Sequence, residues 1–179
     1  AEMSAKAVDA VRNVLIDGSA EEMTRRLEGI YRFSNVRPAH IIHTRTYLKN
    51  NLNFELKKKI ESFKSYRNEV SGELKNKEFL SNKGELRDFF ALSKDIKGLA
   101  YKESSHFLRN IGFKGYAILD KHIINSLHEF GVLKTNEKPK NAKEYLEIEQ
   151  KLIDFSKYAG IGMDELDLLL WSRKNGRIL

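Results

Sequence analysis

The 179-residue sequence has no cysteine, two prolines and a single tryptophan. Without cysteine the chain can form no disulfide, no thiolate zinc site and no iron–sulfur cluster, and any nucleophile must be another side chain. No apolar run approaches the ~20 residues needed to cross a bilayer, and the first residues lack the charged-then-apolar pattern of a secretory signal. We therefore expect a soluble, cytoplasmic protein.

Hydrophobic residues make up 41% of the chain and aromatic residues 10%, which is enough for a packed core at this length. Lys and Arg outnumber Asp and Glu by 32 to 25, so the formal charge is +7. This balance favours polyanionic partners, although lysines that serve only solubility produce the same total.

The interval from Gly29 to Phe54 is more informative than the total charge, because it contains no acidic residue. Its basic residues and histidines are Arg32, Arg37, His40, His43, Arg45 and Lys49. Such an interval suits the binding of phosphate groups, and it is equally consistent with a solvated helix surface.

Apolar residues recur at three- and four-residue intervals along the chain, which predicts amphipathic helices and no strands. Ser19 and Glu22 have the spacing of a capping box, and Pro38 favours the first turn of a third helix. Later helices are expected over 103–111 and 118–130, and the polar segment 134–141 is the best candidate for a linker. We predict an all-α fold in which the helices pack into two lobes.

The segment Ile96-Lys97-Gly98-Leu99-Ala100 stands immediately before one of these helices. Gly98 and Ala100 lack large side chains, so the backbone amides can approach another surface closely. Amides near a helix N-terminus attract anions, and phosphate is the obvious one. By itself, the pattern also fits any tight connection between two helices.

Two polar residues after this turn suggest chemistry. Lys102 is expected in the first turn of its helix, where the helix dipole disfavours a cation and favours the neutral, nucleophilic amine; otherwise it is a solvated surface lysine. Asp120 comes 18 positions later and directly follows Ile118 and Leu119 at a helix start. The free amides there stabilise a carboxylate, so Asp120 taken alone is most simply a helix N-cap.

Together, the runs Gly98-Leu99-Ala100-Tyr101-Lys102 and Leu119-Asp120-Lys121-His122-Ile123 resemble the signature and downstream aspartate of the helix–hairpin–helix DNA glycosylase superfamily. The runs Ser105-His106-Phe107-Leu108-Arg109-Asn110 and Ala117-Ile118-Leu119-Asp120 are similar to the second, prokaryotic family of 8-oxoguanine DNA glycosylase/AP lyases. The resemblance implies one two-lobed catalytic unit over residues 1–179, with the helix–hairpin–helix at about 86–112. Ala100 replaces the usual second glycine of the hairpin, which allows a slightly less close phosphate approach.

The resemblance also implies roles for the motif residues. Lys102 would attack C1′ of the damaged nucleotide and form an imine, while Asp120 would stabilise positive charge on the sugar and orient or deprotonate the lysine. The imine would acidify the C2′ proton, so that β-elimination cuts the strand on its 3′ side. Lys97, Gly98 and Ala100 would bind DNA phosphate, and the chemistry requires no cofactor and no metal.

Base excision also needs a pocket for the flipped-out base. In the resembling family the C-terminal end reaches this pocket, which points to Trp171 and Arg177, although packing in the last helix is the simpler role for Trp171. The segment that contacts DNA near the lesion would fall around residues 33–38. The expected partner is duplex DNA with an oxidised base or an abasic site, bound by a monomer associated with the nucleoid.

Three alternatives remain open at this point. The chain could be a glycosylase/lyase of the same superfamily for a different oxidised base. It could be a non-enzymatic helix–hairpin–helix module in which Lys102 and Asp120 only bind phosphate and cap a helix. A helical protein–protein adaptor is disfavoured by the acid-free interval and the hairpin, and it would bind its partner with little dependence on salt.

Overall fold

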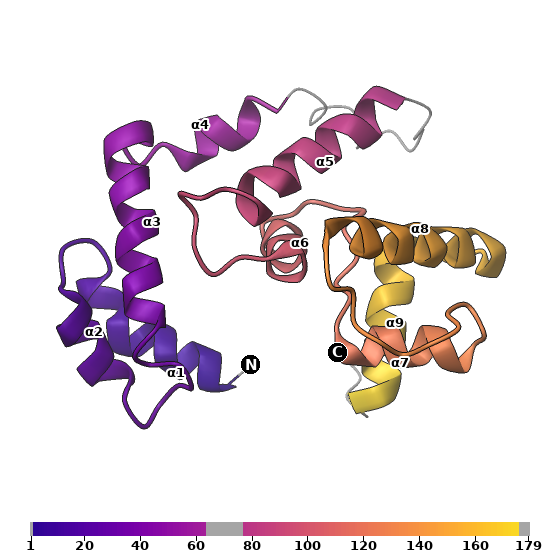
Figure 1. Cartoon of the computed structure of the whole chain (residues 1–179), viewed down its shortest axis with the longest axis horizontal. Helices are drawn as coiled ribbons and strands as arrows, with labels where there is room; N and C mark the ends of the chain where they lie inside the picture. The colour runs from indigo at the N-terminus through magenta and orange to yellow at the C-terminus, as the bar shows by residue number, and fades with distance from the viewer. Residues whose placement is uncertain (1, 64–76, 176–179) are drawn as a thin grey trace. The chain divides into compact units, whose positions relative to one another are not determined.

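A computed structural model of the chain describes residues 2–63 and 77–175, and within those ranges it contains helices and no strand (Figure 1). The chain divides into two compact units, residues 1–98 and 99–179. The first unit comprises α1 (Glu2–Val11), the 3-10 turn η1 (Arg12–Val14), α2 (Ala20–Leu27), α3 (Arg37–Leu52), α4 (Leu56–Glu61) and α5 (Lys77–Ala91). The second comprises α6 (Tyr101–Asn110), α7 (Lys121–Glu129), α8 (Ala142–Ala159) and α9 (Met163–Asn175). The predicted all-α fold is confirmed.

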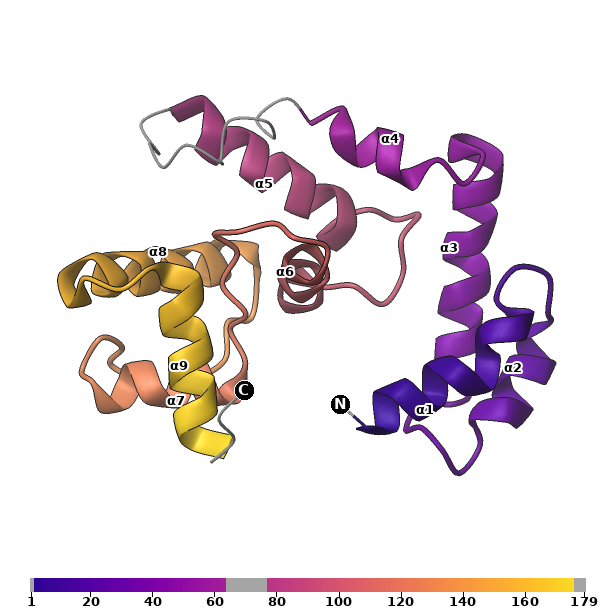
Figure 2. The ribbon, with the colours of Figure 1, turned by 180° about the vertical axis from the view of Figure 1, so that it is seen from behind.

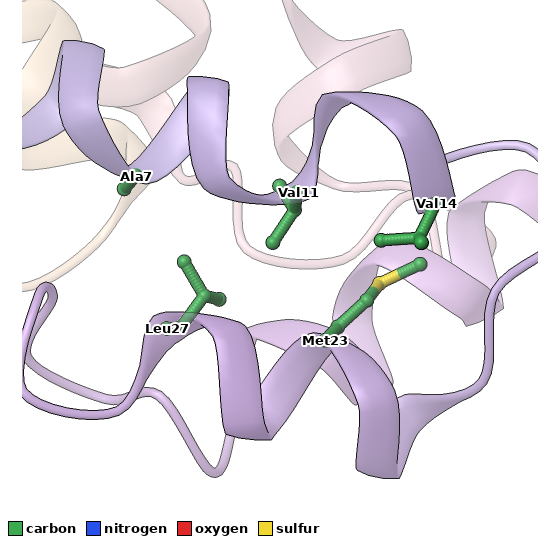
Figure 3. Close-up of a cluster of buried hydrophobic side chains, with 5 residues drawn as sticks. All are labelled: Ala7, Val11, Val14, Met23 and Leu27. Carbon is green, nitrogen blue, oxygen red and sulfur yellow. The ribbon is translucent and has the colours of Figure 1, made fainter.

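A small apolar core holds α1 and α2 together in the first unit (Figure 3). Met23 and Leu27 of α2 point toward Ala7 and Val11 of α1 and toward Val14 of η1, and all five are less than a tenth exposed. Side chains of α3 cover the edge of this cluster. Burial of one large apolar side chain stabilises a fold by about 1.5–3 kcal/mol. Because side chains of α3 pack against this cluster, the cluster also fixes the position of α3.

Helix starts in both units follow local sequence signals. Ser19 caps α2 by accepting a hydrogen bond from Glu22 N at 3.2 Å, and Pro38 lies in the first turn of α3. A capping side chain satisfies a backbone N–H group that has no partner within its helix. Of the two hydrogen bonds in the predicted capping box, the one accepted by Ser19 is present. The Glu22 carboxylate instead forms an ion pair with Arg26 at 2.8 Å.

In the second unit, α9 packs across α7 and α8, as both views of the ribbon show (Figures 1 and 2). The segment 134–141, predicted as a linker, connects α7 to α8 inside this unit, so that prediction is wrong. A polar, proline-containing composition marks an exposed connection, and it does not distinguish a loop within one unit from a linker between two. In the part of the chain that the structure describes, no helix has both the length and the apolar character of a membrane span.

Candidate active site

The predicted phosphate-binding hairpin, residues 96–100, lies between α5 and α6. Gly98 has a left-handed backbone conformation with φ of +81°, which favours glycine. A Cβ atom at this position would lie 3.0 Å from Nδ1 of His40 and 3.5 Å from Nη1 of Arg37, both on α3. Both the backbone angle and the close approach of α3 therefore favour glycine at this position.

Side chains of α3 hold the first half of this hairpin. Thr44 Oγ1 accepts a hydrogen bond from Lys97 N at 3.0 Å, and His43 Nε2 donates to Lys94 O at 3.0 Å. The Lys97 side chain is exposed, and Ala100 is exposed as well. The acid-free interval thus supplies the residues that support the hairpin, and the boundary between the two units falls directly after Gly98.

Helix α6 begins at Tyr101 and has no side-chain N-cap, because its N-cap residue is Ala100. The Glu103 carboxylate serves this end of the helix instead: it accepts hydrogen bonds from the backbone N–H groups of Glu103 and Ala100. Burial acts to raise the pKa of Glu103, but the hydrogen bond and charge of Lys102, with the two backbone groups, lower it below its ordinary value. An anion therefore already occupies the helix start where phosphate was expected.

Lys102 is the second residue of α6, and its side chain is 44% exposed. Its Nζ lies 2.9 Å from Oε1 of Glu103. The position in the first turn of the helix does not by itself indicate this ion pair, which holds the lysine nitrogen at a carboxylate. Before Lys102 can act as a nucleophile, it must lose a proton and leave this ion pair.

Asp120 is the N-cap of α7, as predicted. Its Oδ1 accepts hydrogen bonds from His122 N at 2.7 Å and from Ile123 N at 3.0 Å. These bonds fix the orientation of the carboxylate and hold its charge at the positive end of the helix dipole. Both hydrogen bonds go to Oδ1, so Oδ2 is the oxygen that could contact a substrate.

The backbone of residues 115–119, which leads into Asp120, is held by side chains from α8 and α9. Three carboxylates accept hydrogen bonds from its N–H groups at 2.9–3.1 Å: Asp164 from Gly115, Glu149 from Ala117 and Asp167 from Ile118. No local sequence pattern indicates these residues, because each lies 32 or 49 positions along the chain from its partner. They determine where the α7 N-cap stands relative to the rest of its unit.

Asp167 also links this segment to α6, through an ion pair with Arg109. Arg109 donates a further hydrogen bond to Asp164 O at 3.2 Å. Burial raises the pKa of Asp167 to about 6, against the opposing effects of the Arg109 charge and the Ile118 N–H group. The C-terminal end of α6 and the segment before Asp120 are therefore anchored on the same carboxylate.

The structure says less about the two residues predicted for the base pocket. Trp171 is half-buried on α9, a position compatible with either of its two expected roles. Arg177 lies outside the described residues. In the expected DNA-contacting segment, Phe33 is 57% exposed and has a positive φ of 66°. Among the side chains that the structure describes, no group of three His, Asp or Glu residues could hold a metal ion.

The sequence model of the 8-oxoguanine DNA glycosylase family matches residues 1–161, a range that includes the hairpin, Lys102 and Asp120. The chain belongs to this family. An 8-oxoguanine DNA glycosylase/AP lyase of Fusobacterium nucleatum is 36% identical over 170 residues, which cover 93% of this chain and 68% of the relative. The Methanocaldococcus jannaschii protein of the same name is 33% identical over 160 residues, with coverages of 89% and 65%.

Solved structures of 8-oxoguanine DNA glycosylases have the same fold. One is the M. jannaschii glycosylase/lyase in complex with a 15mer DNA containing 8-oxoguanine: the TM-score is 0.76 at 30% identity, over 99% of this chain and 74% of that one. Another is the 8-oxoguanine DNA glycosylase of Thermotoga maritima, with a TM-score of 0.69 at 25% identity, over 99% and 73%. The chain spans about two thirds of the length of the two curated relatives described above. The predicted membership of the helix–hairpin–helix DNA glycosylases is confirmed.

Proposed function

We propose that this protein is a bifunctional DNA repair enzyme that excises 8-oxoguanine from duplex DNA and then cleaves the strand as an AP lyase. Its family and the names of its relatives support this activity, and a related structure solved with 8-oxoguanine DNA supports the substrate. The observation that carries the proposal is the position of Lys102. This lysine is partly exposed in the first turn of α6, directly after the hairpin, in a unit that also presents the fixed carboxylate of Asp120.

In the proposed reaction the neutral amine of Lys102 attacks C1′ of the damaged nucleotide. The bond from C1′ to the base breaks, and the base leaves with the bonding electrons. Loss of the proton from the attacking nitrogen, with opening of the sugar ring and protonation of O4′, gives an imine. The imine acidifies the C2′ proton, and removal of this proton expels the 3′ phosphate as the C3′–O bond breaks. A hydroxyl nucleophile forms no imine, which explains the use of lysine.

Asp120 would act on the same sugar. Its carboxylate would stabilise the positive charge that develops as the base leaves, and it would accept the proton of Lys102. Hydrogen bonds from His122 N and Ile123 N orient this carboxylate before any substrate binds. Such preorganisation matters because a group that is already aligned needs no reorganisation during the reaction.

Lys97 and the amides of Gly98 and Ala100 would bind a DNA phosphate. In the free protein the Glu103 carboxylate accepts a hydrogen bond from the Ala100 N–H group, so a phosphate at that amide must displace Glu103. Displacement would also separate Glu103 from Lys102 and release the lysine for attack. Trp171 and Arg177 remain the candidates for the base pocket, and the enzyme would act as a monomer on nucleoid DNA.

Borohydride trapping tests the proposal. Wild-type protein incubated with duplex DNA containing 8-oxoguanine and then reduced should form a covalent protein–DNA adduct, and Lys102→Gln should abolish it. Lys143→Gln is the matched control, because Lys143 is also the second residue of its helix, followed by a glutamate, and it should leave the adduct unchanged. No adduct from the wild type with any oxidised-base or abasic duplex, while duplex binding persists, would favour the non-enzymatic binding module.

A second substitution tests the aspartate. Asp120→Asn keeps an N-cap side chain, because asparagine caps helices as well as aspartate does, but it removes the charge and the basic oxygen. Base excision under single-turnover conditions should slow by about 100-fold or more. Full activity in Asp120→Asn would refute the catalytic role of this residue and leave that of Lys102 intact.

A further inference from the structure

Tyr145 of α8 contacts, from a buried position, the two segments that bear Lys102 and Asp120. The side chain is only 3% exposed. Its hydroxyl donates a hydrogen bond to Ala117 O at 2.7 Å and accepts one from Leu119 N at 3.3 Å. Leu119 is the residue directly before Asp120, so the Tyr145 hydroxyl fixes the backbone next to the Asp120 carboxylate.

The same side chain reaches the helix that bears the proposed nucleophile. The tyrosine hydroxyl forms a hydrogen bond with Ser105 Oγ at 3.4 Å, and its ring packs against Tyr101 with the centroids 5.4 Å apart. Tyr101 and Ser105 are four residues apart on α6, so they share one face of the helix, and Lys102 lies between them in the chain. One side chain therefore contacts α6 on both sides of Lys102.

A second side chain of α8 holds the same backbone segment as Tyr145. Glu149 is one turn after Tyr145 on α8, and its Oε1 accepts a hydrogen bond from Ala117 N at 2.9 Å. The peptide groups on both sides of Ala117 are thus held by the same face of α8, and Ala117 is fully buried. A buried carbonyl that loses its partner costs about 1–3 kcal/mol, so the segment is expected to move when the hydroxyl is removed.

We infer that Tyr145 is a positioning residue that sets the Asp120 carboxylate relative to Lys102, an inference that rests on the function proposed above. Tyr145 acts through these two residues and does not touch the substrate. Its hydroxyl should consequently affect the rate of base excision and leave the affinity for DNA unchanged.

Tyr145→Phe removes the hydroxyl and retains the ring that packs against Tyr101. The single-turnover rate of 8-oxoguanine excision should fall by about 10- to 100-fold, as for a misplacement on the order of 1 Å, while the Kd for duplex DNA stays within about twofold. The matched control is Ser156→Ala on the same helix. It removes one hydrogen bond of a buried serine, to Ile153 O at 2.7 Å, and should keep the wild-type rate.

A double variant separates positioning from general loosening of the fold. If Tyr145 acts by placing Asp120, then adding Tyr145→Phe to Asp120→Asn should slow excision by less than about twofold further, since the carboxylate to be placed is gone. A further fall equal to that of Tyr145→Phe alone would overturn the inference, and so would a wild-type rate in Tyr145→Phe. If Tyr145→Phe does not fold, Ser105→Ala removes only the hydrogen bond between the Tyr145 hydroxyl and α6 and keeps the packing of the ring against Tyr101. Ser105→Ala should slow excision in the wild-type protein, and adding it to Asp120→Asn should slow excision by less than about twofold further.

The outcomes also separate this inference from the proposed function. Absence of the borohydride adduct in the wild-type protein would refute the function itself. A normal wild-type adduct together with an unaffected Tyr145→Phe rate would refute only the role of Tyr145.

Discussion

At the scale of single residues, Glu103 has the most direct contact with the proposed nucleophile. Its carboxylate lies 2.9 Å from Lys102 Nζ, and the hydrogen bond and charge of the lysine act to lower the pKa of Glu103. Glu103→Gln removes the ion pair that Lys102 must leave before it attacks, so borohydride trapping should be faster than in wild type. The increase should be less than about tenfold, because both side chains are partly exposed and solvent screens the pair.

Glu144→Gln is the control for this measurement. Glu144 has the same position in the first turn of α8, and its carboxylate accepts a hydrogen bond from Lys140 N at 2.8 Å. The control should show the wild-type rate of trapping. A loss of rate in Glu103→Gln would instead mean that the carboxylate takes part in the reaction, for example by accepting the lysine's proton.

Asp167 is the residue whose ionisation should be visible in stability. Burial raises its pKa from 3.8 to about 6, so the folded protein binds this proton more tightly than the unfolded chain. The resulting stabilisation is complete below pH 3.8 and is lost as the pH rises through about 6. The free energy of unfolding of wild type, relative to Asp167→Asn, should thus fall by about 3 kcal/mol between acidic and neutral pH.

Urea denaturation followed by the fluorescence of Trp171 measures this difference, because the single tryptophan lies in the same unit as Asp167. A difference between wild type and variant that stays constant with pH would show that the Arg109 ion pair keeps Asp167 charged throughout.

At the scale of structural elements, Gly98 joins the hairpin to α3. In Gly98→Ala the left-handed backbone costs about 1 kcal/mol, and the new Cβ meets His40 Nδ1 at 3.0 Å and pushes the hairpin from α3. Both stability and duplex affinity should fall. Gly160→Ala has a similar backbone angle, with φ of +67° and nothing within 4 Å of the new Cβ, so it should lose stability only. Equal DNA affinities for the two variants would exclude the hairpin from DNA binding.

Elements set by their nearest neighbours in the chain could be predicted from the sequence. The caps at Ser19 and Asp120 depend on residues two or three positions away, and both predictions are confirmed. The start of α7 was expected at Ile118 but lies at Lys121. Ile118 and Leu119 bond to side chains of α9 and α8 instead of entering the helix. Those partners are 49 and 26 residues distant, and helical periodicity carries no information about them.

At the scale of the whole molecule, the family could be predicted from the sequence, but the position of the boundary between the two units could not. The family resemblance rests on residues 96–130, where the proposed catalytic residues are close together in the chain, and the family match extends over residues 1–161. The boundary after Gly98 has no compositional signal, because the hairpin must remain short and ordered between two helices. A linker was therefore expected in the more polar segment 134–141, which is a surface loop of the second unit.

The charge of the whole molecule leads to the last prediction. With a net charge of +7, binding to duplex DNA should weaken steeply as salt is added, because each neutralised phosphate releases counterions. If Lys97 contacts one phosphate, Lys97→Ala should reduce the slope of log K against log salt concentration by about 0.9. Lys157→Ala is the control, since Lys157 pairs with Asp154 at 3.7 Å, and its slope should equal that of wild type. An unchanged slope in Lys97→Ala would show that Lys97 contacts no phosphate, and the hairpin amides alone would then be the candidates for phosphate binding.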